Sequence, residues 1–259
     1  MIYNHLQLRE LFHIEFLRWL TRRISHGYYA LKGGANLRFF FNSFRYSEDI
    51  DIDINGVEVS TLKNTVMKIL ESSSFQNIFK PFGIEKIIPQ NIIRAKQTST
   101  TQRFKIHLVT FAREDLLSKI EFSRRGFKGN AVAEHISYTI LREYKLLPLI
   151  VSHYDIRSAI IQKIGALATR PIVQARDVFD LYILSSQCKP SKPKEIKINN
   201  INFTKASESI FEVSFKQFCD TVVSYLSYEN QPEYNSPSLW EEIKLKVVDF
   251  IQELEKYYE

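Results

Sequence analysis

The chain has 259 residues, of which 44% are hydrophobic and 25% are charged, a composition that excludes a disordered chain and a collagen-like fibre. Only eight glycines and eight prolines occur, which favours long helices and strands over a turn-rich β-sandwich. Thirty-five Lys and Arg residues against 29 Asp and Glu give a formal net charge of +6, which suits a polyanionic partner.

Cysteine content and hydropathy predict a cytoplasmic protein. Cys188 and Cys219 are too few for a disulfide framework and are expected to be reduced thiols. No run approaches the roughly 18 apolar residues of a membrane span, and the first residues lack the regions of a signal peptide. We therefore expect no membrane partner.

The first third of the chain predicts alternating helices and strands. Apolar residues three or four positions apart predict a helix over 6–24. The run 28–32 predicts a short buried strand that stops at a glycine pair, and 35–41 predicts a helix. The strict alternation of Asp and Ile over 49–54 then predicts a half-buried strand with one carboxylate face and one apolar face.

Further elements complete a mixed α/β pattern. A helix is expected over 61–72, a hairpin with strands over 84–95 and 103–111, and a strand over 116–125. From about Ala131 the pattern becomes predominantly helical. The expected helices there are 153–170, 174–187, 204–226 and 239–258.

These elements predict an α/β (α+β) fold in which a mixed sheet with flanking helices is followed by a C-terminal helical bundle. We expect a core domain over residues 1–150 and a bundle over 151–259, with about 20 residues of latitude at the boundary.

The most informative pattern is a glycine pair followed by two acids. Gly33 and Gly34 lie between a predicted strand and a predicted helix, where the backbone can approach an anion and helix amides can bind it. Asp49 and Asp51 share one face of a strand, so their carboxylates can bind a divalent cation. Each pattern alone is more often a tight turn or a solvated strand face. Their order within about twenty residues favours a phosphate site beside a metal site, as phosphoryl transfer needs.

These residues also resemble a known family. LKGGANL at 31–37, followed by RYSEDID at 45–51, is similar to the first motif of polymerase β-like nucleotidyltransferases, in the form found in the AbiEii/AbiGii-type toxin family. Further on, KIGALATR at 163–170 and ARDVFDL at 175–181 are similar to that family's later motifs. The motifs leave roughly the last seventy residues uncovered.

The resemblance implies an enzyme that moves an NMP from an NTP to an acceptor with Mg²⁺, through two ions. Asp49 and Asp51 match the pair that binds the metal and is catalytic. Gly33 and Gly34 match the motif that holds the phosphates of the nucleotide, although a hydroxyl-bearing residue is common at the second position in the superfamily. The remaining residues that the first motif assigns to nucleotide binding are Lys32, Arg45 and Ser47.

A two-metal site usually needs a third carboxylate, and Glu121 on the strand 116–125 is the candidate, with Lys119 and Arg125 nearby to meet phosphates. The alternative is an exposed residue that pairs with a neighbouring strand. Asp53 shares the face of the acid pair and is either an acid that supports the metal ligands or a solvated side chain.

The later motifs suggest a second catalytic pair. By resemblance, Lys163 contacts the phosphates of the nucleotide and Asp177 works with it. The alternative is a structural network of ion pairs in which Lys163, Arg170 and Arg176 compensate Asp177 and Asp180.

The implied acceptor is RNA, because some family members are toxins of toxin–antitoxin pairs that add nucleotides to tRNA 3′ ends. A cognate antitoxin is therefore an implied partner.

Basic residues are dense between positions 80 and 128, where they form either a solvated sheet edge or an RNA-binding track. Three alternatives stay open: an enzyme that nucleotidylates protein, a two-metal nuclease, and a catalytically silent module that binds nucleotide, RNA or an antitoxin.

Overall fold

The computed structural model describes residues 3–90, 96–188 and 202–257, and the chain divides into two compact units. Unit 2 takes two short segments from the N-terminal half of the chain, so the division does not follow a single cut in the sequence. The predicted domain boundary stays a proposal. Unit 1 consists of Met1–Phe40, Tyr46–Phe127 and Ala131–Tyr154, and unit 2 of Phe41–Arg45, Lys128–Asn130 and Asp155–Glu259.

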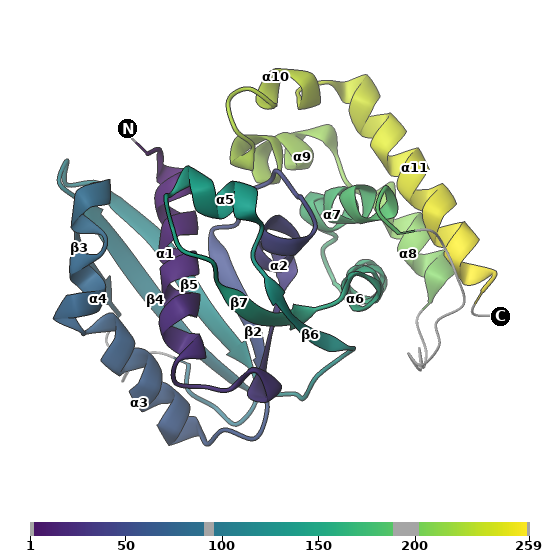
Figure 1. The fold of residues 1–259 in the computed structure, drawn as a ribbon. Helices are drawn as coiled ribbons and strands as arrows, with labels where there is room; N and C mark the ends of the chain where they lie inside the picture. Colours follow the sequence, from purple (N-terminus) through teal and green to yellow (C-terminus); the bar gives the residue numbers. More distant parts are fainter. Residues whose placement is uncertain (1–2, 91–95, 189–201, 258–259) are drawn as a thin grey trace. The chain divides into compact units, whose positions relative to one another are not determined.

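Unit 1 is built on a mixed sheet, which has seven strands within the described residues (Figure 1). The strands are β1 (Tyr29–Lys32), β2 (Asp49–Ile54), β3 (Ile84–Pro89), β4 (Thr101–Thr110), β5 (Asp115–Ser123), β6 (Ala131–His135) and β7 (Ile150–Tyr154). Their order is β3-β4-β5-β2-β1-β7-β6. The pairs β2–β5 and β1–β7 are parallel, and the other neighbours are antiparallel. The predicted fold class, a mixed sheet with helices and a helical C-terminal part, is confirmed.

The helices of unit 1 cover the apolar face of the sheet. Figure 1 shows α1, α3 and α4 side by side over the β3–β4–β5 part, in agreement with the contacts of α1 with β5 and of α3 with β3. The apolar side chains of β2 (Ile50, Ile52 and Ile54) are at most 1% exposed and belong to the shared core. The helical segments are α1 (His5–Thr21), η1 (His26–Tyr28), α2 (Gly33–Phe40), α3 (Val59–Leu70), α4 (Ser73–Asn77), η2 (Lys80–Phe82) and α5 (Tyr138–Glu143).

Local sequence explains where the first helix begins. Asn4 and Gln7 form a capping box in which each side chain accepts a hydrogen bond from the backbone N–H of the other residue, at 2.9 Å in both cases. The apolar stripe that follows, including Leu11, Phe12 and Phe16, is fully buried. The helix predicted over 6–24 is therefore present, with its end at Thr21.

Two strands are missing from the sequence-based prediction. The prediction that the chain is predominantly helical from about Ala131 is wrong for β6 and β7, which complete the sheet of unit 1. Val151, Ser152, His153 and Tyr154 of β7 are all buried, so polar and apolar residues do not alternate there. β6 is an exposed edge strand and shows no apolar face either. Of the strand predicted over 84–95, residues 91–95 lie outside the described residues.

Unit 2 is helical in the part of the chain that the structure describes. The helix predicted over 204–226 is broken, because Ser214 caps a new helix by accepting from the Gln217 N–H at 3.2 Å. Phe218 stacks on Trp240 at 4.3 Å between ring centroids in the core of this unit. The segments are α6 (Ile156–Thr169), α7 (Ala175–Ser185), α8 (Phe203–Ile210), α9 (Phe215–Thr221), η3 (Val223–Tyr225), α10 (Gln231–Tyr234) and α11 (Pro237–Glu255).

Over the described ranges, every helix is too short or too polar to cross a bilayer.

Candidate functional site

The acids of β2 lie on the sheet face opposite the apolar core. Asp51 lies opposite Lys32 of β1 and Glu121 of β5, and Asp49 lies opposite Lys119 of β5. Because directly opposite residues of neighbouring strands point to the same face, these five side chains share one surface of the sheet. The alternation predicted for 49–54 therefore gathers the predicted metal ligands Asp49, Asp51 and Glu121 on one face.

The glycine pair meets this acidic face. β1 ends at Lys32 and α2 begins directly at Gly33, followed by Gly34, so the predicted order of strand, glycine pair and helix is present. Gly33 has a φ of +69°, and a Cβ built there would lie 3.1 Å from Oδ2 of Asp51. The backbone turn thus requires glycine for its conformation, and its small size leaves the carboxylate of Asp51 in contact with the start of the helix.

Partly exposed cations hold the acids of this face. Nζ of Lys119 lies 2.8 Å from Oδ2 of Asp49, and the two side chains are 28% and 33% exposed. Arg103 of β4 lies 2.7 Å from Oε2 of Glu121, with 38% and 25% exposure. Water reaches all four side chains, so these pairs contribute little to stability and can exchange partners.

Asp51 is more enclosed than its neighbours. Burial raises the pKa of Asp51 above its ordinary value, Lys119 and Lys32 act against this shift, and the charges of Glu121 and Asp49 add to it. A cation bound beside this half-buried carboxylate would oppose the shift and stabilise its charged form.

The residues present fit a Mg²⁺ ion, although not a complete set of protein ligands. Among the described residues, no three His, Cys, Asp or Glu side chains lie close enough together to form a metal site. Asp49 and Asp51 still offer carboxylate oxygens on one face, and Mg²⁺ is commonly bound by one or two carboxylates together with water and substrate phosphates. Glu121 as a third ligand stays a prediction, because Arg103 now holds its carboxylate.

Asp53 is buried, which excludes the solvated alternative. Its carboxylate contacts the ammonium group of Lys32 and accepts a hydrogen bond from the hydroxyl of Tyr154 at 2.7 Å. Lys32, which the first motif assigns to nucleotide binding, is therefore oriented by Asp53, and its side chain remains 27% exposed. The role of Lys32 toward a nucleotide stays a prediction.

A buried relay that the sequence analysis missed holds the start of β2. The hydroxyl of Ser118 donates to the Glu48 carbonyl at 2.8 Å, and Nε2 of His13 lies 2.9 Å from the same hydroxyl oxygen. Because the serine proton is used, Nε2 of His13 must be the donor. Burial lowers the pKa of His13 to about 4, with a smaller contribution from Arg9 and opposition from Asp49, so the ring is neutral at pH 7.

Two further contacts hold the elements that carry the motif. The hydroxyl of Ser47, a residue assigned to nucleotide binding, donates to the Asp49 carbonyl at 2.8 Å. On α2, Nε of Arg38 donates to Oε1 of the buried Glu10 at 2.6 Å, and the Tyr144 hydroxyl donates to the other oxygen at 2.7 Å. The helix that begins with the glycine pair is thereby anchored to α1 through Glu10, which also binds Tyr144 at the end of α5.

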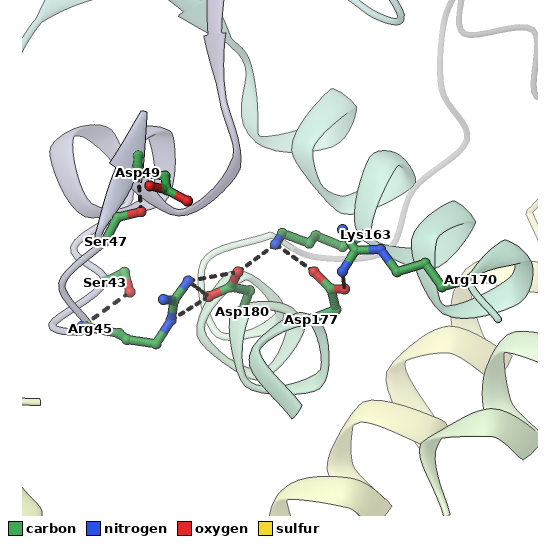
Figure 2. A network of polar contacts seen from close by, with 8 residues as sticks. All are labelled: Ser43, Arg45, Ser47, Asp49, Lys163, Arg170, Asp177 and Asp180. Atoms are coloured by element: carbon green, nitrogen blue, oxygen red, sulfur yellow. Dashed lines mark hydrogen bonds and ion pairs between the residues drawn. The ribbon is translucent and has the colours of Figure 1, made fainter. Parts of the chain in front are cut away.

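The residues of the later motifs form a separate network in unit 2 (Figure 2). Nζ of Lys163 lies 2.8 Å from Oδ1 of Asp177 and 2.5 Å from Oδ2 of Asp180. Arg45 binds both oxygens of Asp180 at 3.1–3.2 Å, and Arg170 lies 2.5 Å from Oδ2 of Asp177. Asp177 is 1% exposed and Asp180 is fully buried.

The charges of this network support one another. Burial opposes the charged form of Lys163, but Asp177 and Asp180 outweigh it and hold the pKa of the lysine above its ordinary value. Burial would likewise raise the pKa of Asp180, but Arg45 and Lys163 hold it below its usual range. Lys163 and Asp180 are therefore both charged at neutral pH.

The structure thus brings Lys163 and Asp177 together, as predicted. The same contacts also fit the alternative in which these residues form a structural network of ion pairs. Arg45, which is predicted to bind nucleotide, binds Asp180. The sequence analysis considered Asp180 only as a member of a structural network of ion pairs. Arg176 is exposed on α7. The catalytic roles of Lys163 and Asp177 and the nucleotide-binding role of Arg45 stay predictions.

Comparison with known proteins adds a family match. The family model described as "Nucleotidyl transferase AbiEii toxin, Type IV TA system" matches residues 15–241. The match extends into the C-terminal helices, well beyond the motifs that are recognisable in the sequence. A search of curated proteins finds no match.

Solved structures share the fold at low sequence identity. The nucleotidyltransferase toxin MenT4 of Mycobacterium tuberculosis H37Rv is 15% identical with a TM-score of 0.58, over 96% of this chain and 84% of that chain. JHP933 of Helicobacter pylori is 17% identical with a TM-score of 0.54, over 100% of this chain and 95% of that chain. A putative nucleotidyltransferase of H. pylori is also 17% identical, with a TM-score of 0.52, over 96% and 95%.

Proposed function

The chain belongs to the nucleotidyl transferase AbiEii toxin family of type IV toxin–antitoxin systems, and on that premise we propose that it moves an NMP from an NTP to an RNA acceptor in a Mg²⁺-dependent reaction. The family establishes nucleotidyl transfer as the class of reaction. The metal, the site residues and the acceptor are the proposed parts.

One observation carries the proposal: Gly33, the first residue of α2, lies so near the carboxylate of Asp51 that a Cβ there would be 3.1 Å from Oδ2. A helix N-terminus with a glycine turn binds phosphate through backbone N–H groups, and a carboxylate pair binds a divalent cation. A Mg²⁺-bound triphosphate needs both at once, and here they are adjacent.

The chain's own residues have the following roles in this proposal. The N–H groups at Gly33 and Gly34 bind phosphate oxygens, and Lys32 adds a positive charge beside them. Asp49 and Asp51 hold the metal, with Glu121 as the candidate third ligand. When bound, Mg²⁺ makes the acceptor hydroxyl easier to deprotonate and neutralises the charge that develops on the leaving group.

The reaction exchanges one bond to phosphorus for another. The acceptor hydroxyl attacks the α-phosphorus of the NTP, the bond from that phosphorus to the bridging oxygen breaks, and pyrophosphate leaves as the hydroxyl proton passes to water. Lys119 has a further role here. Its ammonium group pairs with Asp49 in this structure. When Asp49 binds a cation instead, the ammonium group is released and can bind a phosphate oxygen.

Lys163 and Asp177 are proposed as the second catalytic pair on the strength of the family motifs. The variant Lys163→Met separates this role from a structural one. A contact with the triphosphate predicts a raised KM for the NTP, whereas a role confined to the buried network predicts a lower free energy of unfolding with an unchanged KM.

The direct test incubates the protein with each labelled NTP, Mg²⁺ and either total tRNA or cell lysate. We expect label on RNA and expect the variant Asp51→Asn to abolish it. Label on protein would favour protein nucleotidylation, and shortened RNA would favour a nuclease. Nucleotide binding without any product would favour a silent module. The family also implies an antitoxin, so co-expression with candidate antitoxins should relieve any growth arrest that the protein causes.

A further inference from the structure

In the described part of the chain, the burial of β4 and β5 alternates, so this part of the sheet has one face that is exposed or half-exposed. Along β4, Phe104, Ile106 and Leu108 are buried in the core, while the alternating residues Lys105 and His107 are exposed or half-exposed. β5 shows the same alternation over its whole length. This open surface is the same face of the sheet that carries Asp49 and Asp51.

The strand register arranges this surface in rows. Lys105 of β4, Lys119 of β5 and Asp49 of β2 lie directly opposite one another in one row. In the next row Ile88 of β3, His107 of β4 and Leu117 of β5 lie opposite one another. We call the set Lys86, Ile88, Lys105, His107 and Leu117 the outer sheet face.

Two features of the outer sheet face are unusual for a solvated surface. Ile88 and Leu117 are 47% and 56% exposed, although both lie within paired strands. Two acids of this surface have partners: Glu121 pairs with Arg103 at 2.7 Å, and Oδ2 of Asp115 lies 2.8 Å from Nδ1 of His107. Within the described residues, Lys86 and Lys105 make no ion pair. The surface therefore combines uncompensated positive charge with exposed apolar side chains.

We propose that the outer sheet face binds the single-stranded acceptor end of the RNA, an inference that rests on the proposed function. Lys86 and Lys105 would bind backbone phosphates, while bases would pack on Ile88, His107 and Leu117. A nucleic acid strand alternates anionic and flat apolar groups, and an open sheet with cations and exposed rings or aliphatic groups matches this alternation.

Continuity with the acid pair sets the direction of the strand. β3 is three strand spacings from β2, about 14 Å at a spacing of about 4.8 Å. An RNA end that crosses β3, β4 and β5 therefore brings its terminal hydroxyl to Asp49 over about 14 Å. Lys119, in the same row as Lys105 and Asp49, lies between the outer sheet face and the proposed metal site.

The test measures RNA binding separately from transfer. The double variant Lys86→Ala/Lys105→Ala should weaken the Kd for labelled total tRNA about tenfold and reduce the salt dependence of log Kd by about 1 to 2. The matched control is Lys63→Ala/Lys68→Ala on α3, a helix that packs against the core side of the sheet, and it should bind tRNA like the wild type. The variant Leu117→Ser should weaken binding with an unchanged salt dependence.

The outcomes distinguish this inference from the proposed function. If the wild type binds tRNA through these lysines but transfers no nucleotide, the outer sheet face stands and the transferase proposal fails. If the wild type labels RNA while the double variant binds and labels it equally well, the outer sheet face is wrong and the transferase proposal stands. A wild type that binds no tRNA but labels a protein overturns the RNA assignment, and the surface would then serve a protein acceptor. NTP binding should be equal in all these variants.

Discussion

Two clusters of acids and cations in this chain differ in their exposure to solvent. On β2, Asp49 is 33% exposed and its contact is with Lys119, which is itself 28% exposed. In unit 2, Asp180 is fully buried and is held by both Arg45 and Lys163. The same residue type, Asp, therefore faces an exchangeable partner in one cluster and a closed network in the other.

This difference separates a site that can bind from one that holds structure. A partly exposed ion pair contributes little to stability, so a metal ion can replace the lysine at small cost. A buried charge that loses a partner is left uncompensated in a poorly solvating interior, which is strongly destabilising. The same Asp→Asn substitution should therefore cost much more stability in the buried cluster than in the exposed one.

The largest expected effect is on the stability of unit 2. Asp180→Asn should lower the free energy of unfolding by roughly 3–5 kcal/mol, because Arg45 and Lys163 lose their shared counter-charge. Asp49→Asn, the matched control, should lower it by less than about 1 kcal/mol. Urea unfolding of both variants provides the measurement. Equal stability of the two variants would contradict the distinction between the clusters.

The next effect is on activity. Asp49→Asn should reduce the rate of nucleotide transfer about 10²- to 10³-fold, or roughly 3–4 kcal/mol, because one ligand of the proposed Mg²⁺ is lost. Single-turnover transfer at saturating Mg²⁺ measures the rate, and circular dichroism confirms the fold. A variant that transfers at the wild-type rate would remove Asp49 from the site.

A smaller effect concerns pH, through His13 behind the acidic strand. The unfolded chain takes up a proton at His13 near pH 6.5, and the folded chain does so only near pH 4, because burial lowers its pKa. The unfolded state therefore binds more protons between these values, and stability falls as the pH is lowered. The expected loss from pH 7 to pH 5 is about 2 kcal/mol.

The control for this dependence is His13→Gln, whose side-chain amide can still donate to Ser118 but does not titrate. Denaturant unfolding from pH 7 to pH 5 should show a shallower decline for the variant. Since Asp49 and Arg9 also act on His13, the comparison is best made at constant ionic strength. Parallel curves for both proteins would show that His13 is protonated in the folded state.

The smallest effect concerns the glycine turn. Gly33→Ala should cost about 1–2 kcal/mol of stability, because an alanine at positive φ is strained and its Cβ would press on Asp51. Gly27→Ala is the matched control, since a Cβ at Gly27 meets nothing within 4 Å. Gly33→Ala should also weaken nucleotide binding in an equilibrium assay. If both variants bind and unfold like the wild type, the close approach at Gly33 has no role.

Sequence periodicity predicted the elements whose two faces differ. β2 alternates Asp with Ile, and α1 repeats apolar residues every three or four positions, so each pattern reports a boundary between core and polar surface. β7 is buried from Val151 to Tyr154, and β6 is an exposed edge, so neither alternates between core and polar surface and neither was predicted. The break between α8 and α9 also escaped prediction: α8 ends at Ile210, and Ser214 starts α9 as its N-cap.

The sequence by itself determined the order of strand, glycine pair, helix and acidic strand, because chain spacing and local conformation set that order. It also carried the motifs that identify the family. Tertiary structure alone decided which cation each acid meets: Lys119 for Asp49 through the parallel pairing of β2 with β5, and Arg45 with Lys163 for Asp180 through the packing of unit 2. These partners are distant in the chain, and their choice depends on strand register and burial, which no local pattern of residues encodes.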